Sequence, residues 1–426
     1  MDNQAQAVAT SATSPRITLL EPLTRAPYRL FWIGEVVSKC GDEFQTIALA
    51  TVAIALTGKS TALASILMVQ NLPMALLLLF GGLLVDRYGS RRVLIATNMS
   101  LGVLALVLAG YAARLPLSVA ALYVYALVTG AVRPFYHPAF GSMTPTLVPR
   151  SNLPAANALS RMGLDVSRSI AAPIAGKVIA SYGVVAAFVV NAVTFLQAAG
   201  LQTRIRTSST EQRKPSGTAA IPIRNSVFEG LRAVKNDPVL TGMMLAIVIW
   251  YLGFIGALNV GIAGFAQITL KAGPQGQGVL LAAFGIGNLA GSIVAGSRRN
   301  MGGVRTVMLI TVAAQCLGFT CMMLGHIATL CAIPLLFAGM ANAYLFVFGT
   351  SLIHSRAAPA VRGRVMAVTN LCSFGVYPIS YALAATVADN WGPKGVIVVL
   401  GITLPALSVV VSSRVKEFWA HRLDVR

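Results

Sequence analysis

Charged residues are scarce in this sequence. Only 11% of the 426 residues are charged and 56% are hydrophobic, whereas an ordinary soluble domain carries about 25% charged residues. A soluble globular protein is therefore excluded. Acids are the scarcest charged residues, because 13 Asp and Glu stand against 33 Lys and Arg, for a net charge of +20. The bases form no face with interleaved aromatics, so we expect no nucleic-acid partner.

Catalytic and metal-binding patterns are also missing. The five cysteines lie in or beside apolar runs without metal-ligand spacing, which is typical of small buried residues. No H-E-x-x-H, G-x-S-x-G or paired His/Asp pattern occurs, so we expect neither an enzyme nor a metal or other cofactor. Residues 285–290 match G-x-G-x-x-A but lie inside an apolar run with no preceding strand. Gly287 and Gly291 are predicted instead to let helices pack closely.

Long apolar runs dominate the chain. A helix needs about 20 apolar residues to cross about 30 Å of hydrocarbon. Membrane strands alternate polar and apolar residues, and these runs do not. We therefore predict an all-α membrane protein with twelve transmembrane helices. Their predicted ranges are 30–56, 62–85, 93–113, 117–140, 153–181, 184–201, 239–270, 278–295, 304–324, 328–354, 365–388 and 395–411.

The basic residues mark one side of the membrane. They gather in both tails and in every second connection: 87–92, 150, 203–238, 298–305 and 356–364. Cytoplasmic loops carry the excess of Lys and Arg, so both termini are predicted to be cytoplasmic. Residues 1–22 are polar with no apolar core, so we expect no cleavable signal peptide.

The chain is predicted to divide into two similar six-helix bundles. The pattern of 81–92 recurs at 291–299 without its acid, and 157–173 resembles 366–378. Such a duplication places a binding site between the halves, near the middle of the membrane. The predicted segments are a flexible cytoplasmic tail (1–27), a first bundle (28–202), a cytoplasmic linker with an amphipathic surface helix (203–238), a second bundle (239–413) and a cytoplasmic tail (414–426). The run 239–270 is longer than a bilayer requires, which predicts a tilted or broken helix.

The connection after the second predicted helix is a tight charged turn. It has the order G-x-L-x-D-R-x-G-x-R-R, supplied by Gly82, Asp86, Arg87, Gly89, Arg91 and Arg92. This order resembles the signature loop between helices 2 and 3 of the major facilitator superfamily of transporters, although Ser90 stands where that family usually has a base. Four further stretches resemble the branch of bacterial drug, macrolide and enterobactin exporters: 29–32, 41–42, 155–159 and 362–366.

The resemblance extends over 28–416 and implies how the protein works. It implies a monomeric multi-pass protein of the bacterial inner membrane that moves a small molecule by alternating access. Proton motive force drives such transporters without a cofactor. Asp86 can face Gly363 and Arg364 at the start of the eleventh helix, where a helix N-terminus stabilises a carboxylate by about 0.3–1 kcal/mol. We expect this contact to latch the cytoplasmic side shut.

Ionisable residues within the apolar runs form the candidate site. A charge at the bilayer centre costs about 2.5–3.5 kcal/mol on insertion scales, so its presence indicates a function. The candidates for proton coupling or substrate binding are Glu35, Lys39, Asp42, Arg133, His137 and Asp165.

These ionisable residues leave alternatives open. Glu35, Lys39 and Asp42 share a helix face, which is either self-neutralised or contains a proton carrier. In the second case Glu35 titrates and Asp42 is structural. His137 is a second proton carrier or a satisfied hydrogen-bonding residue. Asp165 belongs to a cluster, with two neighbouring arginines, that is a structural network or a relay.

The second half supplies aromatic residues in place of charges. Trp250, Tyr251, Tyr344 and Tyr377 are expected to line an apolar substrate pocket, with ordinary packing as the alternative for each. The predicted function is proton-coupled efflux of a small organic molecule such as a drug. Export of an anionic siderophore or other metabolite is the main alternative, because the first half has excess bases. A lysolipid transporter and a receptor without flux are further alternatives.

Overall fold

The computed structural model describes residues 19–205, 223–298, 300–358 and 361–424, and these residues are almost entirely helical. The first half contains α1 (Ala26–Thr57), α2 (Ser60–Tyr88), α3 (Ser90–Arg114), α4 (Val119–Val132), α5 (Tyr136–Leu147) and α6 (Leu153–Thr203). Short 3₁₀ turns lie at η1 (Glu21–Thr24), η2 (Arg133–Phe135) and η3 (Arg150–Asn152). Much of the predicted first tail and of the central linker lies outside the described residues.

The second half begins with α7 (Ile223–Asn236) and α8 (Pro238–Gly256). It continues through η4 (Ala257–Gly261), α9 (Ile262–Gly264), η5 (Phe265–Thr269), α10 (Gly273–Ser297), β1 (Asn300–Gly303), α11 (Val304–Leu324), α12 (Ala328–Arg356), α13 (Arg362–Val396), η6 (Ile397–Thr403), α14 (Leu404–Ser412), α15 (Lys416–Ala420) and β2 (Arg422–Asp424). The segments η4, η5 and η6 are π-helical, so the long run after α8 continues as a helix with widened turns.

Nine segments of the described residues are long and apolar enough to cross a membrane. Two of them are 51-residue stretches, 153–203 and 362–412, and each contains two helices. Gly183 (φ 80°) divides the first stretch and Gly392 (φ 66°) the second, in a backbone region that favours glycine. Helix α1 is not among the nine because of its charged residues, but at 32 residues it is long enough to cross a membrane. Counting α1 and both divided stretches in this way gives the predicted twelve helices.

The fourth predicted helix is broken at its centre. Pro134 lies in η2, between α4 and α5, because proline has no N–H for the helical ladder and its ring clashes with the preceding turn. Gly81 of α2 crosses closely here, since a Cβ at that position would lie 2.9 Å from the Pro134 carbonyl oxygen. The break thus places Arg133 at a bend that packs against α2.

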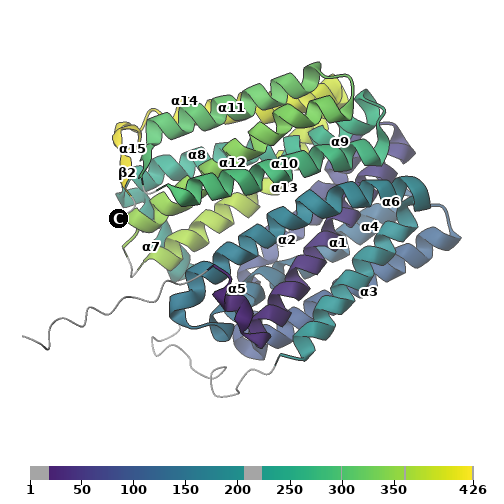
Figure 1. Ribbon diagram of the computed structural model, residues 1–426, viewed down its shortest axis with the longest axis horizontal. Coiled ribbons are helices and arrows are strands. Elements are labelled where there is room, and N and C mark those ends of the chain that lie inside the picture. The colour runs from purple at the N-terminus through teal and green to yellow at the C-terminus, as the bar shows by residue number, and fades with distance from the viewer. Residues whose placement is uncertain (1–18, 206–222, 299, 359–360, 425–426) are drawn as a thin grey trace, which may run out of the picture.

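The helices form two groups, with α1–α6 in one and α8–α14 in the other (Figure 1). The groups meet mainly along α2 with α13 and along α6 with α10. Glycines allow the second contact, because a Cβ on Gly278 would collide with backbone atoms of Ala172. A Cβ on Gly176 would likewise collide with Pro274.

Hydrogen bonds join the two groups at one end. The Lys59 ammonium donates to Asp389 at 2.9 Å, and the Gln267 amide donates to the Thr51 hydroxyl at 3.3 Å. Across the part of the chain that the structure describes, these are the sole hydrogen bonds between the groups. The opposite end carries α5, α7 and the C-terminus, at the left of Figure 1. We call the first end the closed end, because these bonds join the groups there. We call the second the open end, because Asp86 is exposed there and a Cβ on Gly82 or Gly363 would meet open space.

The chain's end packs onto the second group at the open side. Strand β2 pairs antiparallel with β1, which follows α10. Within α15, Phe418 is fully buried and lies against Gly242 of α8. The sequence predicts only a tail here. Helix α7 also packs, since a Cβ on Gly230 would collide with the backbone at Arg364, while Phe228 is exposed.

We predict that Gly291→Ala lowers thermal stability and Gly296→Ala does not. Both glycines belong to α10, but a Cβ at Gly291 would collide with the Met340 carbonyl of α12, whereas the space around Gly296 is open. Overpacking costs about 1–3 kcal/mol, so the first variant should unfold several degrees lower. Thermal unfolding of the purified proteins in detergent measures the difference. Equal melting temperatures for the two variants would contradict the close α10–α12 packing.

Candidate functional site

Two adjoining cavities lie between the helix groups. We call the first, of about 350 Å³, the apolar chamber, and the second, of about 320 Å³, the polar chamber. Most of the apolar chamber is lined by α8, α12 and α13, and most of the polar chamber by α1, α2, α3, η2 and α5. The chambers share three lining residues, His137, Phe374 and Tyr377. Each chamber thus takes residues from both groups.

Asp42 is the centre of charge in the polar chamber. The Arg133 Nη2 donates to Asp42 Oδ1 at 2.8 Å, and the Lys39 Nζ donates to Asp42 Oδ2 at 3.2 Å. Lys39 lies one turn before Asp42 in α1, whereas Arg133 comes from η2, where the proline break exposes it toward α1. One carboxylate therefore compensates two cations in the membrane interior, where an unpaired charge is costly.

Glu35 is held more weakly than Asp42. Its carboxylate accepts a hydrogen bond from the Tyr136 hydroxyl and lies 3.9 Å from the Lys39 ammonium. Lys39 also lies 4.6 Å above the Tyr136 ring. The side chain of Glu35 is buried, with the residue 8% exposed. The sequence analysis missed Tyr136, although its place three residues after Arg133 could have indicated a shared helix face.

His137 stands at the boundary between the chambers. Its ring centroid lies 5.1 Å from that of Phe374 in α13 and 5.5 Å from that of Tyr136. Phe374 in turn lies 5.4 Å from Tyr377. Among the described residues the imidazole has no hydrogen-bond partner. An aromatic wall from both groups therefore separates the two chambers.

Asp165 lies outside the lining of both chambers. Its carboxylate is 3.4 Å from Arg161 Nε, and Arg161 lines the apolar chamber. One turn further along α6, Arg168 pairs with Glu43 of α1 at 3.1 Å. Arg168 lines the polar chamber with the Asp42 cluster, whereas the Arg161–Asp165 pair lies apart from it. The structure therefore brings together five of the six sequence-predicted ionisable residues and leaves Asp165 apart.

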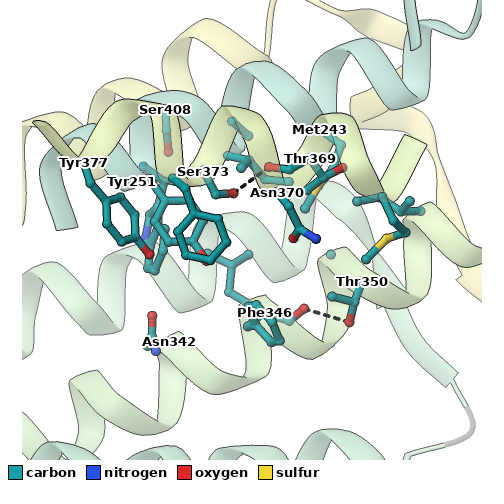
Figure 2. A pocket seen from close by; sticks show the side chains of 18 of the residues that line it. Met243, Tyr251, Asn342, Phe346, Thr350, Thr369, Asn370, Ser373, Tyr377 and Ser408 are labelled. Carbon is teal, nitrogen blue, oxygen red and sulfur yellow. Dashed lines mark hydrogen bonds between the residues drawn. The ribbon is translucent and has the colours of Figure 1, made fainter. Parts of the chain in front are cut away.

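Trp250, Tyr251 and Tyr377 line the apolar chamber (Figure 2). Trp250 is T-shaped against Tyr251, with their centroids 4.9 Å apart. Tyr344 lines neither chamber; its hydroxyl donates to the carbonyl of Met301, a residue of β1, at 3.4 Å. Tyr344 and Phe346 are two positions apart in α12, and two positions turn the side chain to another face of a helix.

Other residues that line the apolar chamber were not among the predicted site residues. They include Met243, Asn342, Phe346, Asn370 and Phe374. None of these residue types is unusual within a membrane helix, so only the folded arrangement singles them out.

The α2–α3 turn keeps the conformation that its glycines require. Gly89 joins the two helices with φ +83°, which favours glycine. Arg91 donates from Nε to the Gln202 carbonyl at 3.1 Å and thereby ties α3 to the end of α6. Arg87 lies over the Tyr88 ring, with 5.4 Å between the guanidinium carbon and the ring centroid, and Arg92 is exposed.

The predicted contact between Asp86 and the start of α13 is not made in this conformation. Asp86 is exposed, and Arg364 instead donates to Glu229 of α7. A Cβ on Gly82 or Gly363 would meet open space. At the open end, Asp86 at the end of α2 therefore makes no contact with the start of α13.

Residues 17–424 match the family described as "Transmembrane secretion effector" (MFS_3). Among curated proteins, the chain is similar to two uncharacterized MFS-type transporters. YfiS of Bacillus subtilis (strain 168) is 27% identical over 275 residues, which is 62% of this chain and 63% of that protein. The protein y4rN of Sinorhizobium fredii (strain NBRC 101917 / NGR234) is 25% identical over 274 residues, 62% of this chain and 64% of that protein. The matches thus span less than two thirds of each relative.

Solved transporter structures share the fold. The nucleoside transporter NupG superposes with a TM-score of 0.72 at 10% identity, covering 91% of this chain and 99% of that one. A bacterial homologue of the iron transporter ferroportin, solved in an inward-facing state, gives 0.67 at 14% identity, covering 93% and 99%. At these identities the likeness concerns the fold alone.

We predict that Asp42→Asn destabilises the protein and Asp389→Asn does not. The first change leaves Arg133 without its anion and Lys39 with only the Glu35 carboxylate at 3.9 Å. A hydrogen bond to a charged group contributes about 1.5–3 kcal/mol. The second change removes an ion pair whose side chains are 66% and 54% exposed, and exposed pairs contribute about 0–1 kcal/mol. Thermal unfolding of both variants in detergent is the measurement. A stability of Asp42→Asn equal to wild type would show that the two cations need no counter-charge.

Proposed function

The chain belongs to the transmembrane secretion effector family of major facilitator transporters, and we propose that it exports a small organic molecule across the bacterial inner membrane in exchange for protons. The family's description supports the outward direction, and both its family and its structural neighbours are transporters and not enzymes. The basic turn at 87–92 supports a cytoplasmic location of the open end and of both termini. In that orientation the protein is ready to take substrate from the cytoplasm.

The observation that carries this proposal is the charge cluster in the polar chamber. Ionisable groups that face a cavity inside the membrane mark proton or substrate pathways. Each proton that enters down 100 mV supplies about 2.3 kcal/mol. Glu35 is the proposed proton carrier because its partners are a hydroxyl and one ammonium at 3.9 Å. Asp42 has two cations at hydrogen-bond distance and therefore gains less from protonation.

The contacts at the two ends indicate which interactions must break and form when the protein alternates between its open and closed conformations. Opening the closed end requires loss of the Lys59–Asp389 pair and separation of α6 from α10. Closing the open end brings α2 toward the start of α13. Arg364 then has to leave Glu229 and move close to Asp86. Glu229 therefore stabilises the open conformation, and Asp86 stabilises the closed one.

Substrate breadth separates the competing versions of this function. A broad drug exporter, an exporter of one siderophore or metabolite and a lysolipid transporter would share the fold and the coupling. Arg161 lines the apolar chamber and favours an anionic substrate. A growth screen against toxic lipophilic cations, beside a comparison of the compounds secreted by cells with and without the protein, separates these versions.

We predict that Glu35→Gln abolishes proton-driven transport but retains exchange of substrate for substrate. The amide cannot release a proton, yet it keeps the hydrogen-bonding shape of the carboxyl group. The measurement is uptake of the most strongly exported compound into inverted vesicles, with and without a proton gradient. Glu417→Gln, an exposed acid of α15, is the control for loss of one negative charge. A Glu35→Gln protein whose uptake still rises with the gradient would assign the proton to another group.

We predict opposite effects for two acids at the open end. Asp86→Asn should insert normally but slow transport about two- to fivefold, because the closed conformation loses a carboxylate at a helix N-terminus. Glu229→Gln should shift the population toward the closed conformation, because Arg364 is released. Accessibility of the single substitution Gly363→Cys in a cysteine-free background to an impermeant maleimide reports the open end. Normal transport by a well-expressed Asp86→Asn variant would remove the proposed latch.

A further inference from the structure

We propose that the apolar chamber is the substrate site and that it takes an amphipathic organic anion: a flat apolar body with one carboxylate-like group. This inference rests on the proposed function and names the class of its substrate. The cavity volume of about 350 Å³ lies within the range of roughly 300–1,000 Å³ for small-molecule sites.

The apolar body has a matching surface. Trp250, Tyr251 and Phe346 line the chamber with two methionines, Met243 and Met308. Trp250 is fixed by a hydrogen bond to Gln315 at 3.3 Å and by stacking on Phe254, with centroids 4.2 Å apart. Rigid aromatics bind flat apolar groups well, and methionines adapt to the shape of a ligand.

Arg161 supplies the anion-binding group. It is the only Lys, Arg, Asp or Glu among the residues that line the apolar chamber, and it crosses from α6 to lie 4.4 Å above the Phe346 ring of the other group. Its Nε faces Asp165 at 3.4 Å without forming a hydrogen bond. Within the described ranges, its terminal nitrogens donate to no residue. A guanidinium with both terminal nitrogens available binds a carboxylate in bidentate fashion.

Asn342 adds a polar anchor. Its amide nitrogen donates to Asn288 at 2.8 Å, while its oxygen has no partner and the residue is only 6% exposed. In Figure 2 the oxygen points toward the side of the chamber where Tyr251 and Tyr377 lie. A buried acceptor without a donor is costly, so a ligand N–H or O–H at this point would be favoured.

The polar chamber is the competing location for an anion, and its charges argue against it. Three cations line that chamber, and each is already paired: Lys39 and Arg133 with Asp42, and Arg168 with Glu43. An anion in that chamber would have to displace a carboxylate, whereas one in the apolar chamber needs only to approach Arg161.

Three probes with one ring system test the charge preference: 1-naphthylacetic acid, 1-naphthylacetamide and 1-naphthylmethylamine. Their binding to the full-length protein in lipid nanodiscs is measured by calorimetry, without a proton gradient. We expect the acid to bind at least about tenfold more tightly than the amide, as hydrogen bonds between charged groups are the stronger ones, and the amine to bind weakest. Equal binding of acid and amide, a preference for the amine, or no binding of any probe would overturn the proposal.

Two substitutions distinguish a ligand-binding arginine from a structural ion pair. Arg161→Gln should weaken binding of the acid about ten- to a hundredfold and leave the amide unchanged. Asp165→Asn should strengthen binding of the acid about threefold or more, because a nearby negative charge is removed. If Arg161 and Asp165 served only as a structural pair, both changes would act in the same direction on binding and on melting temperature. Arg305→Gln, an exposed arginine of α11, is the charge-matched control.

The same experiment separates this inference from the transport proposal. Binding on purified protein needs no flux. A retained preference for the acid together with an absence of proton-driven transport would refute the transport proposal alone. Proton-driven export of neutral or cationic compounds, without any preference for the acid, would refute the site inference alone.

Discussion

The charge compensation of Asp42 is the interaction on which the interior of this protein depends. Helix α1 carries too many charges to satisfy an apolar criterion for a membrane span, yet it packs along α6 at the centre of the first helix group. That position is tolerable because Lys39 and Arg133 both reach Asp42, and because Arg168 reaches Glu43. Arg133 reaches it because Pro134 breaks the helix that carries it. The helix break at Pro134 therefore allows the Arg133–Asp42 ion pair to form in the protein interior.

The contact between the two helix groups is equally specific at its closed end. The α6–α10 contact depends on glycines whose neighbours are backbone atoms, so it cannot loosen gradually through movements of side chains. Packed interfaces of this kind have discrete arrangements. The single exposed pair Lys59–Asp389 contributes little by comparison, so close backbone packing, and not charge, holds this end shut.

The sequence predicted the fold well, because lipid imposes a simple rule on backbone polar groups. Apolar runs of sufficient length have to be helices, and this placed the spans even where a glycine rather than a loop separates two of them. The site was less predictable. Lys39 and Asp42 are neighbours on one helix, so their pairing follows from spacing. Arg133 lies 91 residues from Asp42, and only the folded arrangement brings them together.

Other features had no signal in the sequence. The pairing of Arg364 with Glu229 depends on where α7 packs, and an amphipathic pattern does not distinguish a membrane surface from a helix end. The strand β1 has four residues, two of them glycine, and such a segment resembles a turn. Tyr344 and Phe346 differ by two positions in α12, and without the helix orientation either one is an equally good pocket residue.

The two chambers divide the chemistry between the halves of the chain. Acids and bases that can handle protons come from α1 and η2, whereas the aromatic surface comes from α8, α12 and α13. Coupling is the free energy by which occupancy of one site changes the affinity of the other. We therefore look for an element that both sites contact. His137, Phe374 and Tyr377 meet this condition, since they line both chambers and come from both helix groups. A movement of one group against the other must change the His137–Phe374 contact, and with it the wall that both chambers share. On the proposed mechanism, this wall is where occupancy of one chamber alters the other.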